Sequence, residues 1–470
     1  MITKKLVALG IALAAAAALF TGCSAGKAYD VVVIGSGAAG LSAAIEAASA
    51  GAKVALLEKQ AIVGGSTLIA GGYVYGTGTA EQKKLGITDS PEELAKYWSD
   101  RAEGAADPAM LKFVAEKSGA TIDWLVGLGA KFGDPIPTGT SPVRRGFLSP
   151  EGGPGIVNPL KKEAEAKGVT FFMETPATKL LVSKGAVTGV VAKGKDGKAI
   201  TFNARSVVIA TGGFDRNKEL FTKYAPAYDG AFTYVSAGNT GDGLVMGQAA
   251  GAATSGKGGI IGFRGVPGEP TLASEIGGLM WMPYLYVNKE GKRFVNETSD
   301  YPVFHQALNK QTDKISFLIF DASTYAPALD KGVEKKVAWV ADTLPALAAA
   351  AGIDEKGLVA TVAEYNAAIK KGKDTQFGKA LKGMKPIAKP KFYALSVAAA
   401  SLGTMSGLKI DLDAHVLNAK GEIIPGLFAA GEVANGDFFN QEYPASGTSI
   451  QMCLTFGRVA GQNAAKALKK

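Results

Sequence analysis

The sequence predicts an α/β fold in which a nucleotide-binding domain is interrupted by an inserted α+β domain. Glycine makes up 61 of the 470 residues and follows no collagen-like period, which is typical of a nucleotide-binding protein with many tight turns. Residues 29–58 read as a strand, a glycine-rich turn, a helix and a second strand. This pattern is absent from about 245 to 385, and strand signals resume at 408–410.

The first 23 residues read as a signal sequence. Lys4 and Lys5 precede an apolar run over 6–20, which is shorter than the roughly 20 residues of a membrane-spanning helix. The motif Phe-Thr-Gly-Cys that ends at Cys23 resembles a bacterial lipobox, whose cysteine becomes a lipidated N-terminus. We therefore expect an exported bacterial lipoprotein, periplasmic or at the cell surface, which a lipid anchors to a membrane surface. The alternative is an ordinary cleaved signal in which Cys23 has no role.

The nucleotide-binding domain is expected in two parts, 28–244 and 386–470, on either side of a capping domain at 245–385. In the first part we predict a helix at 41–50, helical structure over 91–130, and strands at 29–34, 53–57, 171–173, 180–182, 187–191, 200–202 and 206–210. Segment 370–391 holds eight lysines and one acidic residue, so we expect a solvated linker there. A final helix is expected after Gly447.

The composition excludes several classes of protein. With 47% apolar and 20% charged residues, the chain is a folded globular protein rather than a disordered one or a coiled coil. The net charge of +9 is diffuse, so nucleic acid is not an expected partner. The cysteines are Cys23 and Cys453 and the histidines are His305 and His415, which excludes a disulfide framework, a thiolate cluster, a haem-attachment motif and a His-rich metal centre.

The first glycine-rich turn has the spacing of a dinucleotide-binding motif. Gly35 makes the turn, Gly37 admits the pyrophosphate, and Gly40 lets the helix pack closely on the strand. The free N–H groups and partial positive charge at the start of the helix bind phosphates. Glu58 ends the second strand, where it is placed to accept hydrogen bonds from ribose hydroxyls. From this motif alone the nucleotide is either FAD or NAD.

Further motifs connect the chain to a family. They are Gly64-Gly65-Ser66-Thr67, Gly71-Gly72, Thr211-Gly212-Gly213, Gly241-Asp242-Gly243, Asn296-Glu297, Gly403-Thr404-Met405-Ser406-Gly407 and Gly431-Glu432. With them the chain resembles, from about Asp30 to its C-terminus, the flavoprotein subunits of the fumarate reductase and succinate dehydrogenase superfamily. It is most similar to flavocytochrome c fumarate reductases and urocanate reductases.

This resemblance implies a Rossmann-like FAD-binding domain, with the substrate between the flavin and the inserted cap. The helix after Gly447 would direct its N-terminus at the flavin. Family members with covalent FAD attach it through a histidine near the second glycine cluster, where this chain has Ser66 and Thr67, so the FAD is expected to be non-covalent. The residues implied in FAD binding are Gly35, Gly37, Ala39, Gly40, Glu58, Lys59, Gly65, Ser66, Thr67, Gly71, Gly72, Thr211, Gly212, Gly213, Asp242, Gly431, Glu432, Ser449 and Ile450.

Four positions depart from the cationic substrate site of fumarate reductases. Where that family has a protonating arginine, a histidine pair, a carboxylate-binding arginine and a further histidine, this chain has Tyr301, Leu402-Gly403, Pro444 and Phe263-Arg264. A buried carboxylate without a partner costs several kcal/mol. We therefore expect a poor fumarate site despite the overall similarity.

The replacements resemble 3-ketosteroid dehydrogenases of the same superfamily. By that resemblance, the hydroxyl of Tyr443 and the N–H of Gly447 hold a carbonyl oxygen, and Tyr301 is the acid or base at the neighbouring carbon. Hydride moves between flavin N5 and the β-carbon, and the two donors stabilise the enolate. The alternative for both tyrosines is a packed ring with a satisfied hydroxyl.

The expected function is that of an exported respiratory reductase of an activated C=C bond, of enone or acrylate type. Because the chain has no haem motif, no iron–sulfur cysteines and no second dinucleotide motif, its electrons come from a separate donor such as a cytochrome or flavoprotein. One alternative is a 3-ketosteroid-type dehydrogenase that forms the C=C bond. Another is a non-enzymatic flavin-binding lipoprotein that transfers electrons.

Six other side chains have two interpretations each. Tyr73 and Tyr75 line the flavin edge or only pack. Arg144, Arg145 and Arg264 bind a substrate carboxylate or form ion pairs. His305 lies one helical turn after Tyr301 and couples to it or makes an ordinary polar contact.

Overall fold

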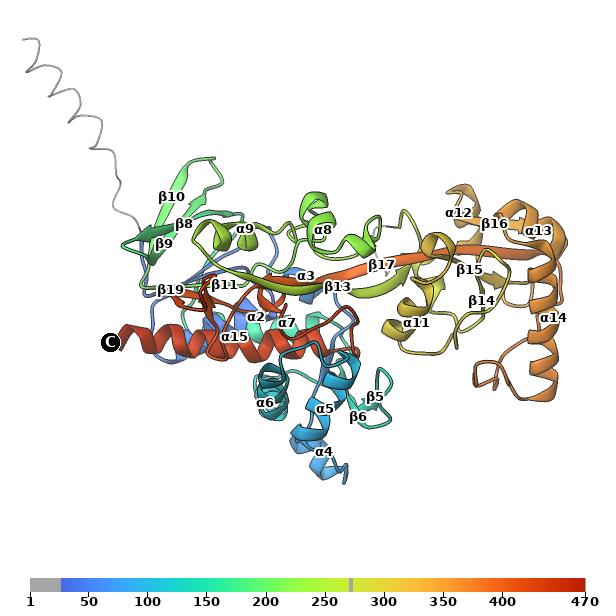
Figure 1. Ribbon diagram of the computed structural model, residues 1–470, viewed down its shortest axis with the longest axis horizontal. Coiled ribbons are helices and arrows are strands. Elements are labelled where there is room, and N and C mark those ends of the chain that lie inside the picture. Colours follow the sequence, from blue (N-terminus) through green and yellow to red (C-terminus); the bar gives the residue numbers. More distant parts are fainter. Residues whose placement is uncertain (1–26, 270–273, 470) are drawn as a thin grey trace, which may run out of the picture.

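The centre of the protein is a six-stranded sheet of order β18-β19-β11-β2-β3-β7, seen in the computed structural model, which describes residues 27–269 and 274–469 (Figure 1). Its strands are β2 (Val31–Ile34), β3 (Val54–Leu57), β7 (Thr170–Phe172), β11 (Ser206–Ile209), β18 (His415–Leu417) and β19 (Ile423–Ala429). Neighbours pair in parallel, except that β18 is antiparallel to β19. Every residue of β2, β3 and β11 is buried, as in parallel strands covered on both faces.

Two helices, α2 (Ala38–Ser49) and α15 (Thr448–Lys466), lie against this sheet and against each other (Figure 1). Glycines on α15 make their contact close: a Cβ on Gly457 would lie 2.4 Å from the carbonyl oxygen of Ala39. A Cβ on Gly461 would lie 2.2 Å from that of Ala43. Helix α15 is thus held directly on the backbone of α2.

Smaller elements complete the nucleotide-binding domain. Two small sheets contain β1 (Lys27–Ala28), β8 (Ala177–Ser183), β9 (Ala186–Lys193) and β10 (Ala199–Asn203), and β4 (Tyr73–Tyr75), β5 (Ile136–Pro137) and β6 (Arg144–Leu148). The other helices are α3 (Gly65–Leu68), α4 (Ala80–Lys84), α5 (Pro91–Arg101), α6 (Pro108–Gly127), α7 (Pro154–Ala166), α8 (Lys218–Tyr224), η1 (Pro226–Tyr228), α9 (Asp242–Ala249), η4 (Glu432–Ala434) and η5 (Ala467–Lys469).

The cap is built on a second large sheet of order β12-β17-β15-β14, in which β13 and β16 also pair with β17. Its strands are β12 (Phe232–Thr233), β13 (Thr254–Gly265), β14 (Leu285–Val287), β15 (Ile315–Phe320), β16 (Ala338–Ala341) and β17 (Phe392–Leu408). Its helices are α10 (Glu275–Gly278), η2 (Leu279–Trp281), α11 (Tyr301–Leu308), η3 (Thr312–Lys314), α12 (Ala328–Glu334), α13 (Leu344–Ala351) and α14 (Glu355–Lys371).

The antiparallel ribbon of β13 and β17 runs from the nucleotide-binding domain into the cap (Figure 1). Met405 and Leu408 belong to the core of the first domain, whereas the part of β17 from 393 to 400 belongs to the core of the cap. Leu402 and Tyr301 pack against both cores. The chain therefore passes from the cap back to the nucleotide-binding domain within β17. The boundary predicted at 386 stays a prediction.

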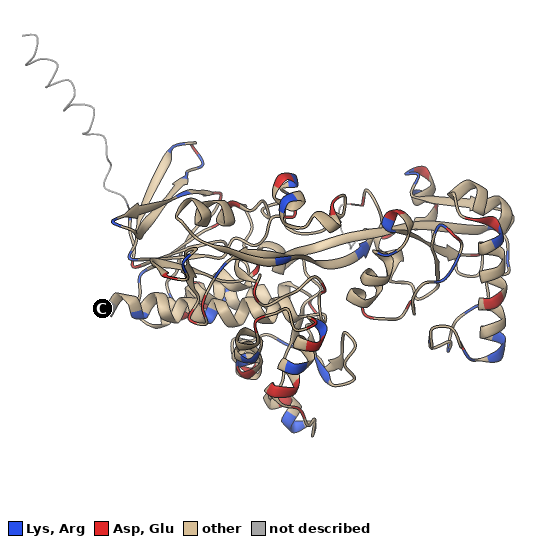
Figure 2. Ribbon diagram, in the orientation of Figure 1, with Lys and Arg blue, Asp and Glu red and all other residues tan. Residues whose placement is uncertain are grey.

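The predicted elements around the glycine-rich turn and after Gly447 are present. The helical stretch predicted over 91–130 is two helices, because Asp107 caps and Pro108 begins a second one. The predicted signal sequence over 1–23 lies outside the described residues. Within the described ranges, no helix combines the length and apolarity needed to cross a membrane. Lysine and arginine are interspersed with acidic residues over the outer helices, and β17 carries no charge (Figure 2).

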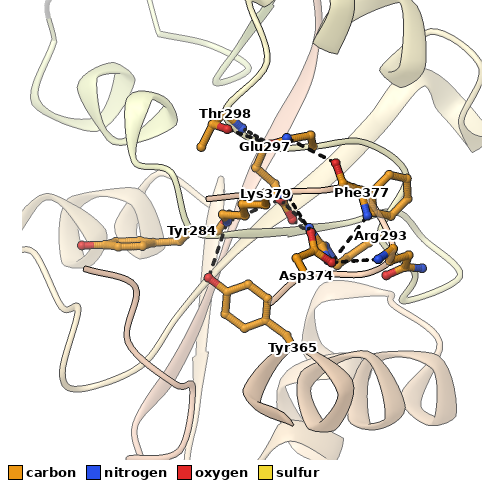
Figure 3. Close-up of polar contacts among 10 residues, drawn as sticks. Tyr284, Arg293, Glu297, Thr298, Tyr365, Asp374, Phe377 and Lys379 are labelled. Carbon is orange, nitrogen blue, oxygen red and sulfur yellow. Dashed lines mark hydrogen bonds and ion pairs between the residues drawn. The ribbon is translucent and has the colours of Figure 1, made fainter. Parts of the chain in front are cut away.

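The prediction of a solvated linker over 370–391 is wrong at one lysine. Lys379 is buried, and its Nζ lies 3.4 Å from Glu297 and donates to the carbonyl oxygen of Tyr284 (Figure 3). Arg293 forms ion pairs with Glu297 at 2.8 Å and with Asp374 at 3.0 Å. Two buried cations and two buried anions thus compensate one another, which is the condition under which such charges are tolerated inside a protein.

Candidate active site

A cleft of about 800 Å³ opens at the carboxyl ends of β2, β3 and β11, where open α/β sheets bind ligands. Most of the residues predicted to bind the nucleotide line it: Gly35, Gly37, Ala39, Glu58, Lys59, Gly65, Ser66, Thr67, Thr211, Gly212, Asp242, Gly431 and Glu432. Those that do not line it are Gly40, Gly71, Gly72, Gly213, Ser449 and Ile450.

The three glycines of the turn have three different surroundings. Gly35 has a φ of +103°, and a Cβ there would lie 2.3 Å from the carbonyl oxygen of Ala210. A Cβ on Gly40 would lie 1.9 Å from the carbonyl oxygen of Gly35, so this glycine lets the helix approach the strand. A Cβ on Gly37 would meet nothing nearer than Thr67 Oγ1 at 3.8 Å, so Gly37 faces the open cleft, where a pyrophosphate needs the space.

The start of α2 offers free donors to the cleft. The N–H of Ala38 donates to Thr67 Oγ1 at 3.2 Å, whereas the N–H groups of Ala39 and Gly40 have no partner among the described residues. The hydroxyl of Thr211, on the cleft wall, is buried and likewise has no partner in the part of the chain that the structure describes. Unpaired donors at a helix N-terminus favour an anionic group, and FAD carries one in its pyrophosphate.

Charged side chains surround the same cleft. Glu58 accepts hydrogen bonds from the N–H of Ser36 at 3.0 Å and from its hydroxyl at 2.6 Å, so the carboxylate is fixed beside the glycine turn. Lys59 forms an ion pair of 2.7 Å with Asp242, at the start of α9. This pair joins the end of β3 to the far wall of the cleft.

Glu432 is the buried acid of the site. It accepts hydrogen bonds from the N–H of Thr404 at 2.7 Å and from Asn239. Burial, with a contribution from the charge of Asp215, raises the pKa of Glu432 to about 8. Burial also raises the pKa of Asp215 to about 6, against the hydrogen bond from the hydroxyl of Ser401. Glu432 is therefore largely protonated at neutral pH and is a possible hydrogen-bond donor to a cofactor.

Tyr301 and Tyr443 come together at the junction of the two domains. Tyr301 is the first residue of α11 in the cap, and Tyr443 precedes α15. Their rings stack with centroids 6.1 Å apart and planes 18° apart. Burial raises the pKa of Tyr301 well above 10, helped by the neighbouring Tyr443 and by the charge of Asp300. Burial likewise raises the pKa of Tyr443, so both phenols are protonated donors at neutral pH.

Gly447, which caps α15, lies next to this pair. Its φ is +94°, and a Cβ there would lie 2.8 Å from the carbonyl carbon of Val74, so only glycine fits. Ser449 donates its N–H to the hydroxyl of Tyr443 at 2.8 Å. The N–H groups of Gly447 and Ile450 make no hydrogen bond within the described ranges. The start of α15 therefore presents two free donors beside the tyrosine pair.

Aromatic side chains surround the ring of Tyr301 on the cap side. Phe263 contacts the ring of Tyr301 at 5.0 Å and that of Trp281 at 5.4 Å, and Trp281 is 49% exposed. Arg264 is the next residue of the strand and points elsewhere: its guanidinium lies 4.0 Å from the ring centroid of Phe304. Its Nε and Nη1 have no hydrogen-bond partner among the described residues. Arg264 thus does not form the ion pair considered from the sequence, and its contact with a substrate stays a prediction.

The other side chains with two interpretations contact neighbouring residues of the protein. Arg145 forms a buried ion pair of 2.6 Å with Asp89. Burial lowers the pKa of His305 to about 4, and its ring packs against Tyr228 rather than binding Tyr301. Tyr75 packs against Trp98, and Tyr73 is half-buried near Asp300, whose charge adds to burial in raising the pKa of Tyr73.

Sequence reasoning missed several residues that line the cleft: Ser36, Ala177, Ser236, Gly238, Asn239, Met246 and Cys453. Ser36 lies inside the glycine motif and was open to prediction. Asn239 lies two residues before the Gly241-Asp242-Gly243 motif, which was the signal for it. Ala177 and Met246 are apolar residues without any sequence signature. No group of three or more His, Cys, Asp or Glu side chains suited to a metal occurs in the described residues.

Comparison with known proteins agrees with this geometry. The sequence model of a family described as an FAD binding domain matches residues 30–450. A fumarate reductase (cytochrome) from Shewanella frigidimarina is 37% identical over 94% of this chain and 78% of its own length. A urocanate reductase from Eggerthella lenta is 34% identical over 93% of this chain and 74% of its own length.

A solved structure is similar over nearly the whole of both chains. It is that of 3-ketosteroid-Δ4-(5α)-dehydrogenase from Rhodococcus jostii RHA1 in complex with 4-androstene-3,17-dione, with a TM-score of 0.74, 29% identity and coverage of 95% of this chain and 98% of that one. The predicted fold class and the predicted FAD cofactor are confirmed. The chain therefore belongs to the fumarate reductase and succinate dehydrogenase flavoprotein family, and it is an FAD-dependent oxidoreductase acting on CH–CH groups.

Proposed function

We propose that the protein reduces the activated C=C bond of an uncharged carbonyl compound, of enone or acrylate-ester type. The observation that carries the proposal is the stacked pair of Tyr301 and Tyr443 beside the unpaired N–H of Gly447. The relatives are named for the reduction of fumarate and urocanate, which are both alkenes conjugated to a carboxyl group. They support the reaction class, and the residue roles below are our own assignment.

In the proposed reaction, Tyr443 and Gly447 hold the carbonyl oxygen. The hydroxyl of Tyr443 already accepts the N–H of Ser449, so its own proton is free to be donated. Bound FAD, expected to be non-covalent, supplies the hydride that the β-carbon of the substrate receives. Each preorganised donor to the resulting enolate oxygen contributes about 2.7–4 kcal/mol to lowering the barrier.

Tyr301 supplies the proton for the α-carbon. A phenol whose pKa is raised by burial remains protonated over the whole physiological range, and its ring contacts the second phenol and Phe263. Transfer of its proton to the enolate turns C=C into CH–CH. Tyr301 then recovers a proton from solvent, so that atoms and charge balance.

Phe263 and Trp281 argue against a dicarboxylate substrate. A carboxylate placed against the buried ring of Phe263 would lose hydration without gaining a cation from that ring, at a cost of several kcal/mol. An uncharged, partly apolar acceptor suits the same wall.

The proposal includes export and an external electron donor. The basic and apolar segments of 1–23 and the motif ending at Cys23 support a lipoprotein, periplasmic or at the cell surface, anchored to a membrane. A separate cytochrome or flavoprotein would deliver the electrons there. Loss of membrane association and of palmitate labelling in Cys23→Ala is the expected result, and a soluble, unlabelled parent protein would contradict the anchor.

Stopped-flow spectroscopy of the chemically reduced holoprotein tests the reaction. We expect enones to reoxidise the flavin quickly and fumarate to do so slowly. Tyr301→Phe should slow reoxidation by enones, whereas Tyr325→Phe, which removes an exposed phenol, should not. Rapid turnover of fumarate would contradict the proposal.

The same experiment separates the two alternatives. Bleaching of the oxidised flavin by saturated ketones would favour the dehydrogenase. Exchange of electrons with dyes alone, without any organic acceptor, would favour the electron-transfer lipoprotein.

A further inference from the structure

Asp300 joins three separate segments at the tyrosine pair. It caps α11, where its Oδ1 accepts the N–H of Tyr301 at 2.9 Å. Its Oδ2 accepts the N–H of Gly139 at 2.7 Å. Ser446 donates both its hydroxyl, at 2.8 Å, and its N–H, at 3.3 Å, to the same carboxylate. One side chain of the cap is thus bonded to the loop after β5 and to the segment that carries Tyr443 and Gly447.

The bonds to Ser446 also determine the direction of the Gly447 N–H. Ser446 is held on one side by Asp300, and its carbonyl oxygen accepts the hydroxyl of Thr138 on the other, at 3.4 Å. In a planar trans peptide, the C=O of Ser446 and the N–H of Gly447 point in opposite directions. Fixing Ser446 at its N–H, hydroxyl and carbonyl therefore aims the Gly447 N–H away from Thr138.

Asp300 acts on Tyr301 through the backbone. Tyr301 is the first residue of α11, and the bond from its N–H to Asp300 fixes the start of the helix from which the phenol projects. Tyr301 and Gly447 belong to different domains and share no hydrogen bond among the described residues. Asp300 is bonded to both segments.

We propose that Asp300 is a positioning residue that aligns the proton donor of the cap, Tyr301, with the carbonyl clamp of the FAD-binding domain at Gly447. This inference rests on the proposed function of those two residues. The carboxylate takes part in none of the ion pairs of the described residues. Its charge is balanced by four N–H and O–H donors, so the bonds give direction as well as energy. A neutral or longer side chain would reproduce them only in part.

Amide hydrogen exchange on the FAD-loaded protein tests the geometry without using activity. Asp300→Ala removes the acceptor for three backbone N–H groups, those of Gly139, Tyr301 and Ser446. Peptides covering 136–142, 299–306 and 443–449 should lose protection together. The matched control is Asp354→Ala, which removes an equivalent N-cap from α14 in the cap, far along the chain from the site. In this control only the peptide at the start of α14 should change.

Kinetics test the positioning role. If the Gly447 donor loses its direction, reoxidation by an enone should slow about 100-fold, the lower end of the loss of one oxyanion donor. KM should change little, because the apolar wall that binds the substrate stays in place. Asp300→Glu should recover part of the rate, and Asp354→Ala should keep the parent rate. Should Asp300→Ala fail to fold, Ser446→Ala removes only the hydroxyl contact and should give a smaller loss in the same direction.

The possible outcomes separate the two claims. A parent protein that reduces enones, with Asp300→Ala no slower than Asp354→Ala, overturns the positioning role. The same holds if the three peptides keep their protection in Asp300→Ala. If the parent protein reduces no enone while the three peptides still lose protection together, the proposed function is wrong and the structural role of Asp300 stands.

Discussion

Tyr443→Phe removes one oxygen atom and thereby tests the carbonyl clamp. In the parent protein this hydroxyl accepts the N–H of Ser449 at 2.8 Å and has a proton left for the substrate. Loss of one preorganised donor to an oxyanion raises the barrier by about 2.7–4 kcal/mol, which corresponds to a rate about 10²–10³ lower. The ring and its stacking on Tyr301 remain, so binding of an apolar acceptor should be nearly unchanged.

The assay is single-turnover reoxidation of the reduced holoprotein by an enone. Tyr228→Phe is the matched control, because it deletes a buried phenol hydroxyl that donates to the carbonyl oxygen of Gln441 at 3.1 Å. Each variant should lose about 0.5–1.5 kcal/mol of unfolding free energy for its hydrogen bond. Only Tyr443→Phe should lose rate. A Tyr443→Phe rate within a few-fold of the parent, at equal FAD content, would refute the clamp.

Two further predictions concern buried acids. Glu432 has a pKa raised to about 8 in the folded state against about 4.3 unfolded, so its contribution to stability is full below about pH 4 and is lost as the pH rises through 8. The thermal unfolding temperature of the FAD-free protein should therefore decrease as the pH rises from 5 to 8. Glu432→Gln should make this decrease smaller, and an unchanged pH dependence would contradict the assignment. Burial acts to raise the pKa of Asp374, but hydrogen bonds from Arg293 and from backbone N–H groups outweigh it and hold the pKa below its usual value. The stabilising effect of Asp374 is therefore present above about pH 4 and lost on acidification. Asp374→Asn should lower the free energy of unfolding by about 3–5 kcal/mol at neutral pH, because it leaves a buried cation uncompensated. Denaturant unfolding measures this loss, and a loss under about 1 kcal/mol would contradict the prediction.

The first strand–turn–helix–strand unit could be predicted because its signals are local. Hydrophobic runs, glycine spacing and the acid at the end of the second strand are all within 30 residues, and each has a single steric reason. The final helix was also predicted, and the structure shows Gly447 in a left-handed conformation at its start. The meeting of Tyr301 and Tyr443 came from family resemblance, because these residues are far apart in the chain and no local pattern joins them.

The remaining features depend on which face of an element meets which neighbour. Phe263 and Arg264 follow one another in β13, so they necessarily point to opposite sides, but the sequence does not say which side faces Tyr301. Lys379 looked like any other residue of a basic linker, because its partner Glu297 lies more than 80 residues away. In the sequence, Asp300 resembles an ordinary helix cap, because its hydrogen bonds with Gly139 and Ser446 form only in the folded protein. Such contacts are tertiary and have no signature along the chain.

The paired strands β13 and β17 have a consequence for protein engineering. The polypeptide leaves for the substrate-facing lobe and comes back from it on adjacent strands, and these two crossings lie at one place, where Ile260 pairs with Thr404 and Gly262 with Ser401. Transplanting that lobe between homologous enzymes thus means matching this two-stranded seam together with β12, which pairs with β17 in the cap sheet. The flavin-holding half would keep its own hydrophobic interior throughout such an exchange.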